Sequence, residues 1–207
     1  MAIQINGNGT ITGISVGGLP DGIVDTDMIA NSAVTTAKSS GLGTSTRTLG
    51  STVTLSNQSS VDFTISDSSI ERFEVHFNAV SCSNDVNFLI RIGTGGSVDT
   101  SGYRVQRGYH GPSSGNSRGQ VDSPNGFYTY GVAANGYSNN GIFRFFRIAS
   151  TENKWYCRAD FTEYANPNHW FYVTGYRNLS GAIDIVKVLP ESGTFDSGHL
   201  RLVTYSD

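Results

Sequence analysis

The chain has 207 residues, of which 25 are glycine and only 5 are proline, so it is neither collagen-like nor fully disordered and fits one globular domain plus an additional segment. A net charge of −3 gives no basic face for phosphates, which argues against nucleic acid and anionic membranes as partners. The first residues, MAIQINGNGTITGIS, do not form a secretory signal, and no apolar run reaches the ~20 residues of a membrane span. We therefore expect a protein that is made in a cytoplasm and is not inserted into a membrane.

Residues 1–47 differ in composition from the rest, because no aromatic residue precedes Phe63. Short apolar alternations around Asn-Gly pairs lead to a turn at 17–22, and a short helix is predicted over 27–38 with Asp25 or Thr26 as its N-cap. Apolar side chains without a local core need burial from elsewhere, so we expect this extended N-terminal segment to oligomerise or to dock on another protein. A disordered tail is the alternative interpretation.

The stretch 73–92, FEVHFNAVSCSNDVNFLIRI, carries two apolar alternations on either side of a polar turn. Phe73, Val75 and Phe77 recur at period two, and the alternation resumes after residue 85 with Val86 and Phe88. A buried helix is the alternative, but the β-branched and aromatic residues favour strands. The pattern therefore predicts a β-hairpin with its turn at 81–85.

Strand-like stretches follow one another at short spacing from residue 48 to the C-terminus, and no helix is predicted among them. They are 51–55, 60–65, 73–79, 86–92, 102–107, 126–132, 141–149, 154–161, 170–175, 183–188 and 200–205. Such a series, with turns rich in Gly, Asn and Ser, predicts an all-β domain over 48–207, a β-sandwich that is jelly-roll-like. The cluster Gly93-Thr94-Gly95-Gly96 is expected to be a turn, because no helix follows it that would complete a phosphate cradle.

Metal binding and catalysis find no motif in this sequence. The histidines are not spaced as metal ligands, and we expect no metal and no cofactor. There is no Gly-x-Ser-x-Gly element, so we expect no enzyme, although Glu152, Asp160 and Glu163 remain a conceivable carboxylate set for glycoside cleavage. Cys82 and Cys157 are too few for a disulfide framework, and both are expected to be reduced.

Two polar stretches, 109–125 and 163–169, interrupt the strands and are predicted to be loops. They and the segment around residue 137 combine aromatic faces with amide and imidazole groups, which suits sugars, because a ring stacks on C–H patches while polar groups meet hydroxyls. The alternative is that the rings belong to the core and the Asn residues to turns. The candidate ligand-binding residues are Tyr109, His110, Tyr137, Tyr164, Asn166, Asn168, His169 and Trp170.

Three segments carry a resemblance to a known class of proteins. The opening INGNGTITGISVGGLPDG, followed by IVDTDMIANSAVTTAK, resembles N-terminal segments of tail-fibre and other virion structural proteins of tailed bacteriophages, notably cyanophages. The end, IDIVKVLPESGTFDSGHLRLVTYSD, resembles the carboxyl end of a common phage fibre domain, with a Gly-Thr-Phe-Asp-x-Gly turn at 193–198. The stretch 73–92 with the GTGGSVDTSGYR that follows it is similar to the same domain.

The resemblance implies a trimeric virion appendage without catalytic residues, whose N-terminal part docks on other virion proteins and whose β-domain faces the host. We therefore expect a homotrimeric fibre protein located on the virion that recognises a host-surface polysaccharide. The alternative is a structural decoration, cement or baseplate component without receptor binding.

Overall fold

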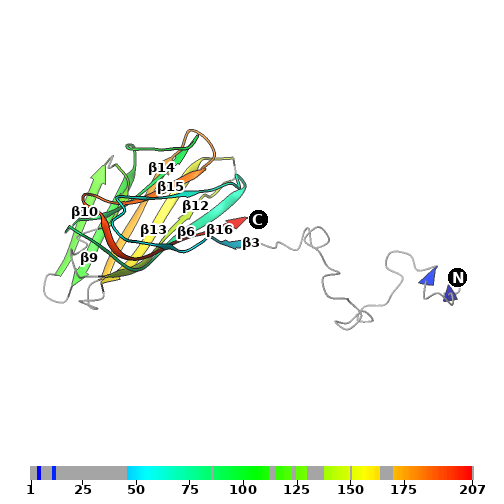
Figure 1. Ribbon diagram of the computed structural model, residues 1–207. Coiled ribbons are helices and arrows are strands. Elements are labelled where there is room, and N and C mark those ends of the chain that lie inside the picture. The colour runs from blue at the N-terminus through cyan, green and yellow to red at the C-terminus, as the bar shows by residue number, and fades with distance from the viewer. Residues whose placement is uncertain are drawn as a thin grey trace. The chain divides into compact units, whose positions relative to one another are not determined.

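Figure 1 shows the computed structural model of the chain, which describes residues 4–5, 11–12, 46–84, 86–111, 115–122, 125–129, 138–149, 151–163 and 170–206. The chain divides into two units, residues 1–44 and residues 45–207. In the first unit β1 (Gln4–Ile5) pairs antiparallel with β2 (Ile11–Thr12). The helix predicted over 27–38 lies outside the described residues.

Nine strands of the second unit form the larger of its two sheets. Their bounds are β3 (Thr46–Leu49), β4 (Val53–Thr54), β6 (Ile70–Cys82), β9 (Arg104–Gly111), β10 (Gly115–Asp122), β12 (Asn139–Phe146), β13 (Lys154–Glu163), β14 (Trp170–Asn178) and β16 (Phe195–Ser206). The strand order is β10-β9-β14-β13-β12-β6-β16-β3, and β4 also pairs with β16. All these pairings are antiparallel, and β3 crosses the predicted domain boundary at residues 47 and 48.

The smaller sheet has five strands. They are β5 (Val61–Thr64), β7 (Phe88–Thr94), β8 (Ser97–Val98), β11 (Phe127–Tyr128) and β15 (Ile185–Pro190). The order is β11-β7-β15-β5, and β8 pairs with β7. Gly95 and Gly96 connect β7 to β8 at φ +68° and +73°, a conformation that glycine adopts without steric cost, so the predicted turn at 93–96 is confirmed.

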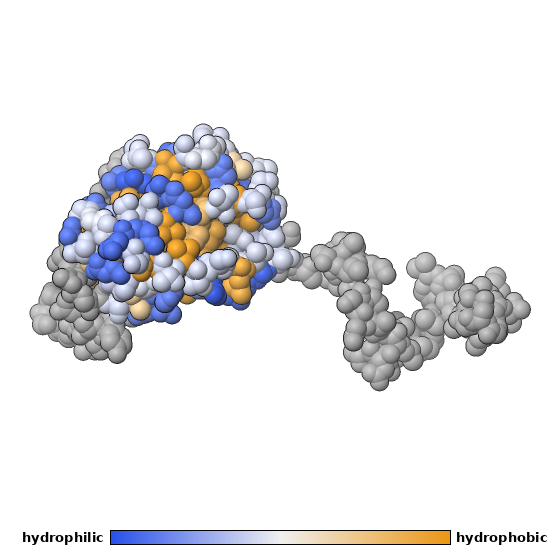
Figure 2. All heavy atoms as spheres, viewed as in Figure 1, coloured by the Kyte–Doolittle hydropathy of each residue, from blue (hydrophilic) through white to orange (hydrophobic). Residues whose placement is uncertain are grey.

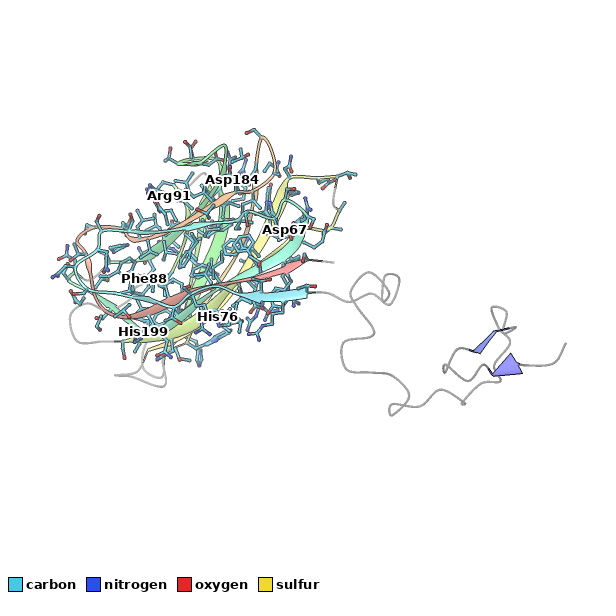
Figure 3. The ribbon with its side chains drawn as sticks, turned by 45° about the vertical axis from the view of Figure 1, so that its right-hand side comes forward. Asp67, His76, Phe88, Arg91, Asp184 and His199 are labelled. Atoms are coloured by element: carbon cyan, nitrogen blue, oxygen red, sulfur yellow. The ribbon has the colours of Figure 1, made fainter. Side chains whose placement is uncertain are left out.

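One hydrophobic core lies between the two sheets and is built mainly of aromatic rings. Phe73 of β6 stacks on Phe145 of β12 with ring centroids 4.4 Å apart, and Phe127 of β11 meets Phe145 edge-on at 5.3 Å. Phe77 of β6 likewise contacts Phe88 of β7 at 5.5 Å. In Figure 3 Phe88 lies between His76 and His199 on one side of the domain and Arg91 and Asp184 on the other. Rings contributed by both sheets thus hold the sheets together.

Alternation at period two explains which residues reach this core. Over 73–77 of β6, 143–146 of β12 and 155–161 of β13, side chains buried between the sheets alternate with side chains on the outer face. The large apolar residues that stay exposed in the described part of the chain are Leu49, Phe146, Ile148 and Trp170. On the face that Figure 2 shows, apolar residues gather near the middle with hydrophilic residues around them.

The prediction of an all-β domain is confirmed, since the described residues contain strands and no helix. Each strand predicted from residue 51 onward overlaps an observed strand, whereas β3, β8 and β10 were not predicted. Among these same residues, no helix capable of spanning a membrane is found. Cys82 and Cys157 are both buried, and the structure shows no disulfide bond between them, so their reduced state stays a prediction. Burial raises the pKa of the Cys157 thiol, which disfavours the reactive thiolate.

The predicted β-hairpin over 73–92 is wrong, although both of its strands exist. β6 pairs with β12 and β16 in the larger sheet, whereas β7 pairs with β15, β11 and β8 in the smaller one. The connection between them therefore crosses from one sheet to the other. The physical reason is that both alternations point their apolar residues into the same core from opposite sides, which a crossing satisfies as well as a hairpin does.

The predicted loop over 109–125 is also wrong for most of its length. β9 and β10 form an antiparallel hairpin in which Tyr109 pairs with Ser117 and Arg104 with Asp122. β10 is the last strand of the larger sheet, so its backbone pairs on one side only. Its sequence, GNSRGQVD, carries no apolar alternation, and an edge strand stabilised by backbone hydrogen bonds does not require one.

The aromatic core makes a direct prediction about stability. Phe73 has no exposed surface and contacts both Phe145 and Trp155, so Phe73→Ala should lower the free energy of unfolding by about 3–5 kcal/mol. Ile148→Ala is the control, since Ile148 is 76% exposed and its truncation should change stability by less than about 0.5 kcal/mol. Urea denaturation of both variants measures the difference; equal midpoints would contradict the proposed core.

Candidate functional site

The outer face of the larger sheet brings together side chains from six strands of the chain. Strand register places them in rows across the sheet. One row runs through Tyr172 of β14, Asp160 of β13, Ile142 of β12, His76 of β6 and Arg201 of β16. The next row runs through His110 of β9, Trp170 of β14, Thr162 of β13 and Asn140 of β12. Residues in one row, and those two positions away on the same strand, share a face.

An open groove of about 640 Å³ follows these two rows. Its polar lining comes from imidazole, amide, hydroxyl and charged groups, and Trp170 adds an aromatic face that is 42% exposed. His76 and His199 lie on the same side of the domain in Figure 3. The residues that line this groove, hereafter the Trp170 groove, are Thr52, His76, Phe77, Asn78, Asn140, Gly141, Ile142, Arg144, Asp160, Phe161, Thr162, Trp170, His199, Leu200 and Arg201.

A chain of charged side chains holds the centre of the Trp170 groove in place. Arg144 Nη1 donates a hydrogen bond of 3.1 Å to Asp160 Oδ2, and Arg144 Nε lies 3.9 Å from Glu74 Oε1. Glu74 Oε2 lies 2.8 Å from His76 Nε2 and accepts a hydrogen bond of 3.2 Å from Tyr205 Oη. These contacts fix the positions of Arg144, Asp160 and His76 before any ligand arrives.

The Glu74 carboxyl is ionised more readily than a free carboxyl. Burial by itself would raise its pKa, but hydrogen bonds from His76 and Tyr205, together with the charges of His76 and Arg72, outweigh burial. The pKa of Glu74 therefore lies below its ordinary value of 4.5. A general acid at neutral pH needs the opposite shift, so this carboxylate is suited to holding its neighbours and not to proton donation.

Trp170 and Tyr172 form an aromatic pair at one end of the groove, with ring centroids 5.4 Å apart. Across the strand pair, Tyr172 faces Gly108 of β9, and a Cβ atom at Gly108 would come within 2.4 Å of the Tyr172 ring. The glycine thus leaves room for the Tyr172 ring to lie over β9. His110 is exposed and pairs in register with Trp170, so these two residues predicted as ligand-binding share this end of the face.

Asn140 and its neighbours shape the other end of the Trp170 groove. Asn140 Oδ1 accepts a hydrogen bond of 2.9 Å from the backbone N–H of Ala79, which has φ +51°. The register between β12 and β6 shifts at this point, so the amide stabilises an irregularity in β6. Within the described part of the chain, the exposed side chains of Asn78 and His199 make no hydrogen bond, which leaves their polar groups available to a ligand.

The residues predicted to bind a ligand are only partly brought together. Trp170 lines the groove, and His110 lies beside it on β9. The backbone of Tyr109 belongs to β9, where it pairs with Phe171. The other predicted residues, Tyr137, Tyr164, Asn166, Asn168 and His169, lie outside the described residues.

Most residues of the groove were not predicted. His76, Asn78, Asn140, Thr162 and His199 occupy the polar positions of strands, which the sequence presents as an ordinary solvated face. Only the strand order brings β6, β12, β13, β14 and β16 side by side. The one signal in the sequence was the presence of His, Asn and Thr at outward positions of these strands.

In the described residues no metal site is found, and Glu152 and Asp160 of the suggested carboxylate set lie far apart, while the side chain of Glu163 lies outside the described part. No group of three or more His, Cys, Asp or Glu side chains is placed to hold a metal ion in the part of the chain that the structure covers. Glu152 precedes β13 and Asp160 lies near its far end, so the extended strand separates them by roughly 20 Å or more. Glycosidase carboxylates lie within about 10 Å of each other, so Glu152 and Asp160 do not form such a pair.

Comparison with known proteins gives no assignment: no protein-family model and no curated protein matches this chain.

Glu74 gives a prediction about how the free energy of unfolding changes at acidic pH. Because its pKa is lowered in the folded state, the ionised carboxylate stabilises the fold above pH 4.5, and this contribution is lost as the pH falls through the folded pKa. Glu74→Gln should lower the free energy of unfolding at pH 7 by roughly 1–2 kcal/mol and make it fall less steeply below pH 4.5. Chemical denaturation between pH 7 and pH 3 measures both effects.

Asp196→Asn is the control for this experiment, since Asp196 is an exposed carboxylate on β16. It should change the stability at pH 7 by less than about 0.5 kcal/mol. A pH profile of Glu74→Gln that parallels that of the unmodified protein would show that this carboxylate does not carry the acid dependence.

Proposed function

We propose that this protein is a non-enzymatic virion fibre protein of a tailed bacteriophage that binds a host-surface glycan through its β-domain. The observation that carries the binding part of the proposal is the Trp170 groove. It sets an exposed indole beside amide, imidazole and hydroxyl groups on one rigid sheet. Saccharides are recognised by this combination, in which an aromatic ring stacks on C–H groups and polar side chains meet the hydroxyls.

The sheet face is well suited to binding, because its side chains are held by strands and by ion pairs. Sites on strands lose less conformational entropy on binding than sites on loops do. The two sheets that face each other across one core support the proposed β-sandwich with jelly-roll-like character. Folds of this kind occur among viral and lectin domains, and this analogy supports the proposal.

A non-enzymatic role is supported by the chemistry of the groove. Asp160 is engaged by Arg144, and Glu74, just beside the groove, is kept ionised by its partners. Acid–base cleavage of a glycan needs one carboxyl group with a raised pKa near a second carboxylate. The described residues of the groove supply anchoring groups in place of such a pair.

Attachment to the virion and trimeric assembly are the parts of the proposal supported by the sequence resemblance alone. Residues 5–38 resemble N-terminal segments of phage virion proteins, and the N-terminal segment 1–47 has no aromatic residue to build a core of its own. We propose that it joins the protein to the particle and contributes to a homotrimer.

One observation favours the alternative of a structural decoration or baseplate component. β3 is an edge strand whose four residues are all exposed, and its Leu49 is 51% exposed. An open edge with an apolar side chain can pair with a strand of another protein. In that case the β-domain would serve assembly, and the Trp170 groove would not bind a receptor.

The glycan-binding proposal predicts that Trp170→Ala weakens adsorption to host cells by roughly tenfold, because removal of an exposed stacking ring costs about 1–3 kcal/mol. Folding should be nearly unchanged, since Trp170 is the first residue of β14 and is partly exposed. Adsorption of virions carrying the variant, together with its melting temperature, measures both.

Thr64→Ala is the matched control, an exposed position at the end of β5 in the smaller sheet. It should leave adsorption unchanged. A well-folded Trp170→Ala variant that adsorbs as strongly as Thr64→Ala would contradict receptor binding by the groove and favour the structural alternative.

The attachment proposal predicts that deletion of residues 1–45 abolishes incorporation into virions while residues 46–207 remain folded. The described strands of the β-domain begin at Thr46, so the deletion removes none of them.

The assembly proposal predicts that light scattering of the full chain gives the mass of a trimer. A stable monomer at micromolar concentration, or virions that still incorporate the truncated chain, would refute this part.

A further inference from the structure

A second groove lies on the same outer face, toward the opposite ends of the strands. It has a volume of about 580 Å³ and is shaped by β9, β12, β13 and β14. Phe146, the last residue of β12, lines it and is 41% exposed, so we call it the Phe146 groove. The described residues that line it are all different from those that line the Trp170 groove. Binding at Trp170 alone therefore leaves this groove unexplained.

The Phe146 ring is held by its neighbours but keeps an exposed surface. It stacks on Tyr156 of β13 with ring centroids 5.7 Å apart, and Tyr156 lies 6.1 Å from Tyr176 of β14. The Lys154 ammonium lies 5.1 Å from the Tyr156 ring centroid and 4.3 Å from that of Tyr176, so it occupies part of the surface of these two rings. Phe146 is thus the ring of this row that is most open to a ligand.

Phe146 and Trp170 are alike in exposure and share one face of the larger sheet, since Trp170 is 42% exposed. Trp170 pairs with Thr162 and Phe146 pairs with Tyr156, and these two partners are six residues apart on β13. Six residues of extended strand correspond to roughly 20 Å. A ligand that contacts both rings must therefore cross β13 and must be longer than a single monosaccharide.

Polar side chains occupy the stretch of β13 between the two rings. Asp160 and Arg158 are the outward residues between Thr162 and Tyr156, and Arg158 pairs in register with Thr174 of β14. Arg158 and Thr174 are both exposed. Carboxylate, guanidinium and hydroxyl groups can all form hydrogen bonds with the hydroxyls of a sugar. The combination of rings and polar groups found in the Trp170 groove thus continues along β13 to Phe146.

The charged side chains along this path are already matched within the protein. Asp160 accepts a hydrogen bond of 3.1 Å from Arg144 and lies 3.9 Å from Arg158 Nε. Arg104, which lines the Phe146 groove, has an interaction partner of its own and stands opposite Asp122 of β10 in register. A charged ligand would have to compete with these partners, so the face suits an uncharged one.

We propose that Trp170 and Phe146 are the two stacking anchors of one extended site, which binds several consecutive sugar units of a linear, uncharged polysaccharide. One sugar stacks on each ring, and the polar side chains of β13 and β14 form hydrogen bonds with the units between them. The extended site depends on the proposed function, because its first anchor is Trp170. Ligand length then determines affinity, since a disaccharide reaches only one anchor.

The test is a length series of oligosaccharides bound to the full-length protein. Calorimetric titration compares the disaccharide with the octasaccharide in the cellulose, mannan and chitin series. At least one octasaccharide should bind about tenfold more tightly than its disaccharide, because it gains the second stacking ring. Equal affinity for the short and long forms in every series, or binding of none, would overturn the extended site.

The charge of the ligand is tested with a matched pair of oligosaccharides. Mannuronate octasaccharide differs from mannose octasaccharide in carrying a carboxylate on each unit. It should bind no more tightly than the mannose form at low salt, where attraction between charges is strongest. Tighter binding of the acidic form would contradict recognition of an uncharged chain.

Three variants locate the gain in affinity. Phe146→Ala should remove the advantage of the octasaccharide and leave the affinity for the disaccharide unchanged, whereas Trp170→Ala should weaken the binding of both. Ile148→Ala is the matched control, because Ile148 is an apolar residue with 76% exposure that lines neither groove. Melting temperatures check that each variant is folded. An advantage that survives Phe146→Ala, or that Ile148→Ala removes equally, would contradict the assignment to Phe146.

The same measurements separate the extended site from the proposed function. Binding that requires Trp170 but is equally tight for short and long forms would overturn the extended site and leave the Trp170 groove standing. Binding that is unaffected by Trp170→Ala would contradict the proposed function itself. A Phe146→Ala variant that binds normally but has a lower mass in light scattering would assign this ring to a contact between copies of the chain and overturn its role in glycan binding.

Discussion

The aromatic layer between the two sheets is the contact on which the rest of the β-domain depends. Phe73, Phe145 and Trp155 come from β6, β12 and β13, and Phe127 reaches Phe145 from the smaller sheet. Each ring occupies an inward position at period two. If the pairing register of any of these strands shifted by one residue, its aromatic rings would point toward solvent. Burial of the rings therefore fixes the register. That register then determines which side chains meet on the outer face.

The outer face of the larger sheet carries little of the core packing and can therefore serve binding. Ion pairs of Arg144 with Asp160 and Glu74 hold the middle of this face, and exposed aromatic residues lie toward both ends of the strands. A rigid, partly aromatic face of this kind favours an extended ligand, because the side chains need little ordering when it binds.

The sequence indicated the strands much better than their partners. The period-two pattern that begins at Phe73 identified a buried face, because burial repeats locally every second residue. Such patterns could not reveal that β6 and β7 join different sheets, since both face the same core. The groove was less predictable still: His76 and Arg201 meet through pairing of β6 with β16, across more than half of the chain. Trp170 was predicted from local chemistry alone, and His110 with it.

The two tryptophans allow the most direct test of glycan binding at the Trp170 groove. Trp155 is buried in the core, whereas Trp170 is exposed in the groove. Labelling both indoles with ¹⁵N and titrating the full-length protein with host-surface polysaccharide should shift the Trp170 N–H signal, assigned with Trp170→Phe, and leave that of Trp155 in place. A polysaccharide that binds without moving the Trp170 signal, or that shifts both signals equally, would contradict recognition by this face.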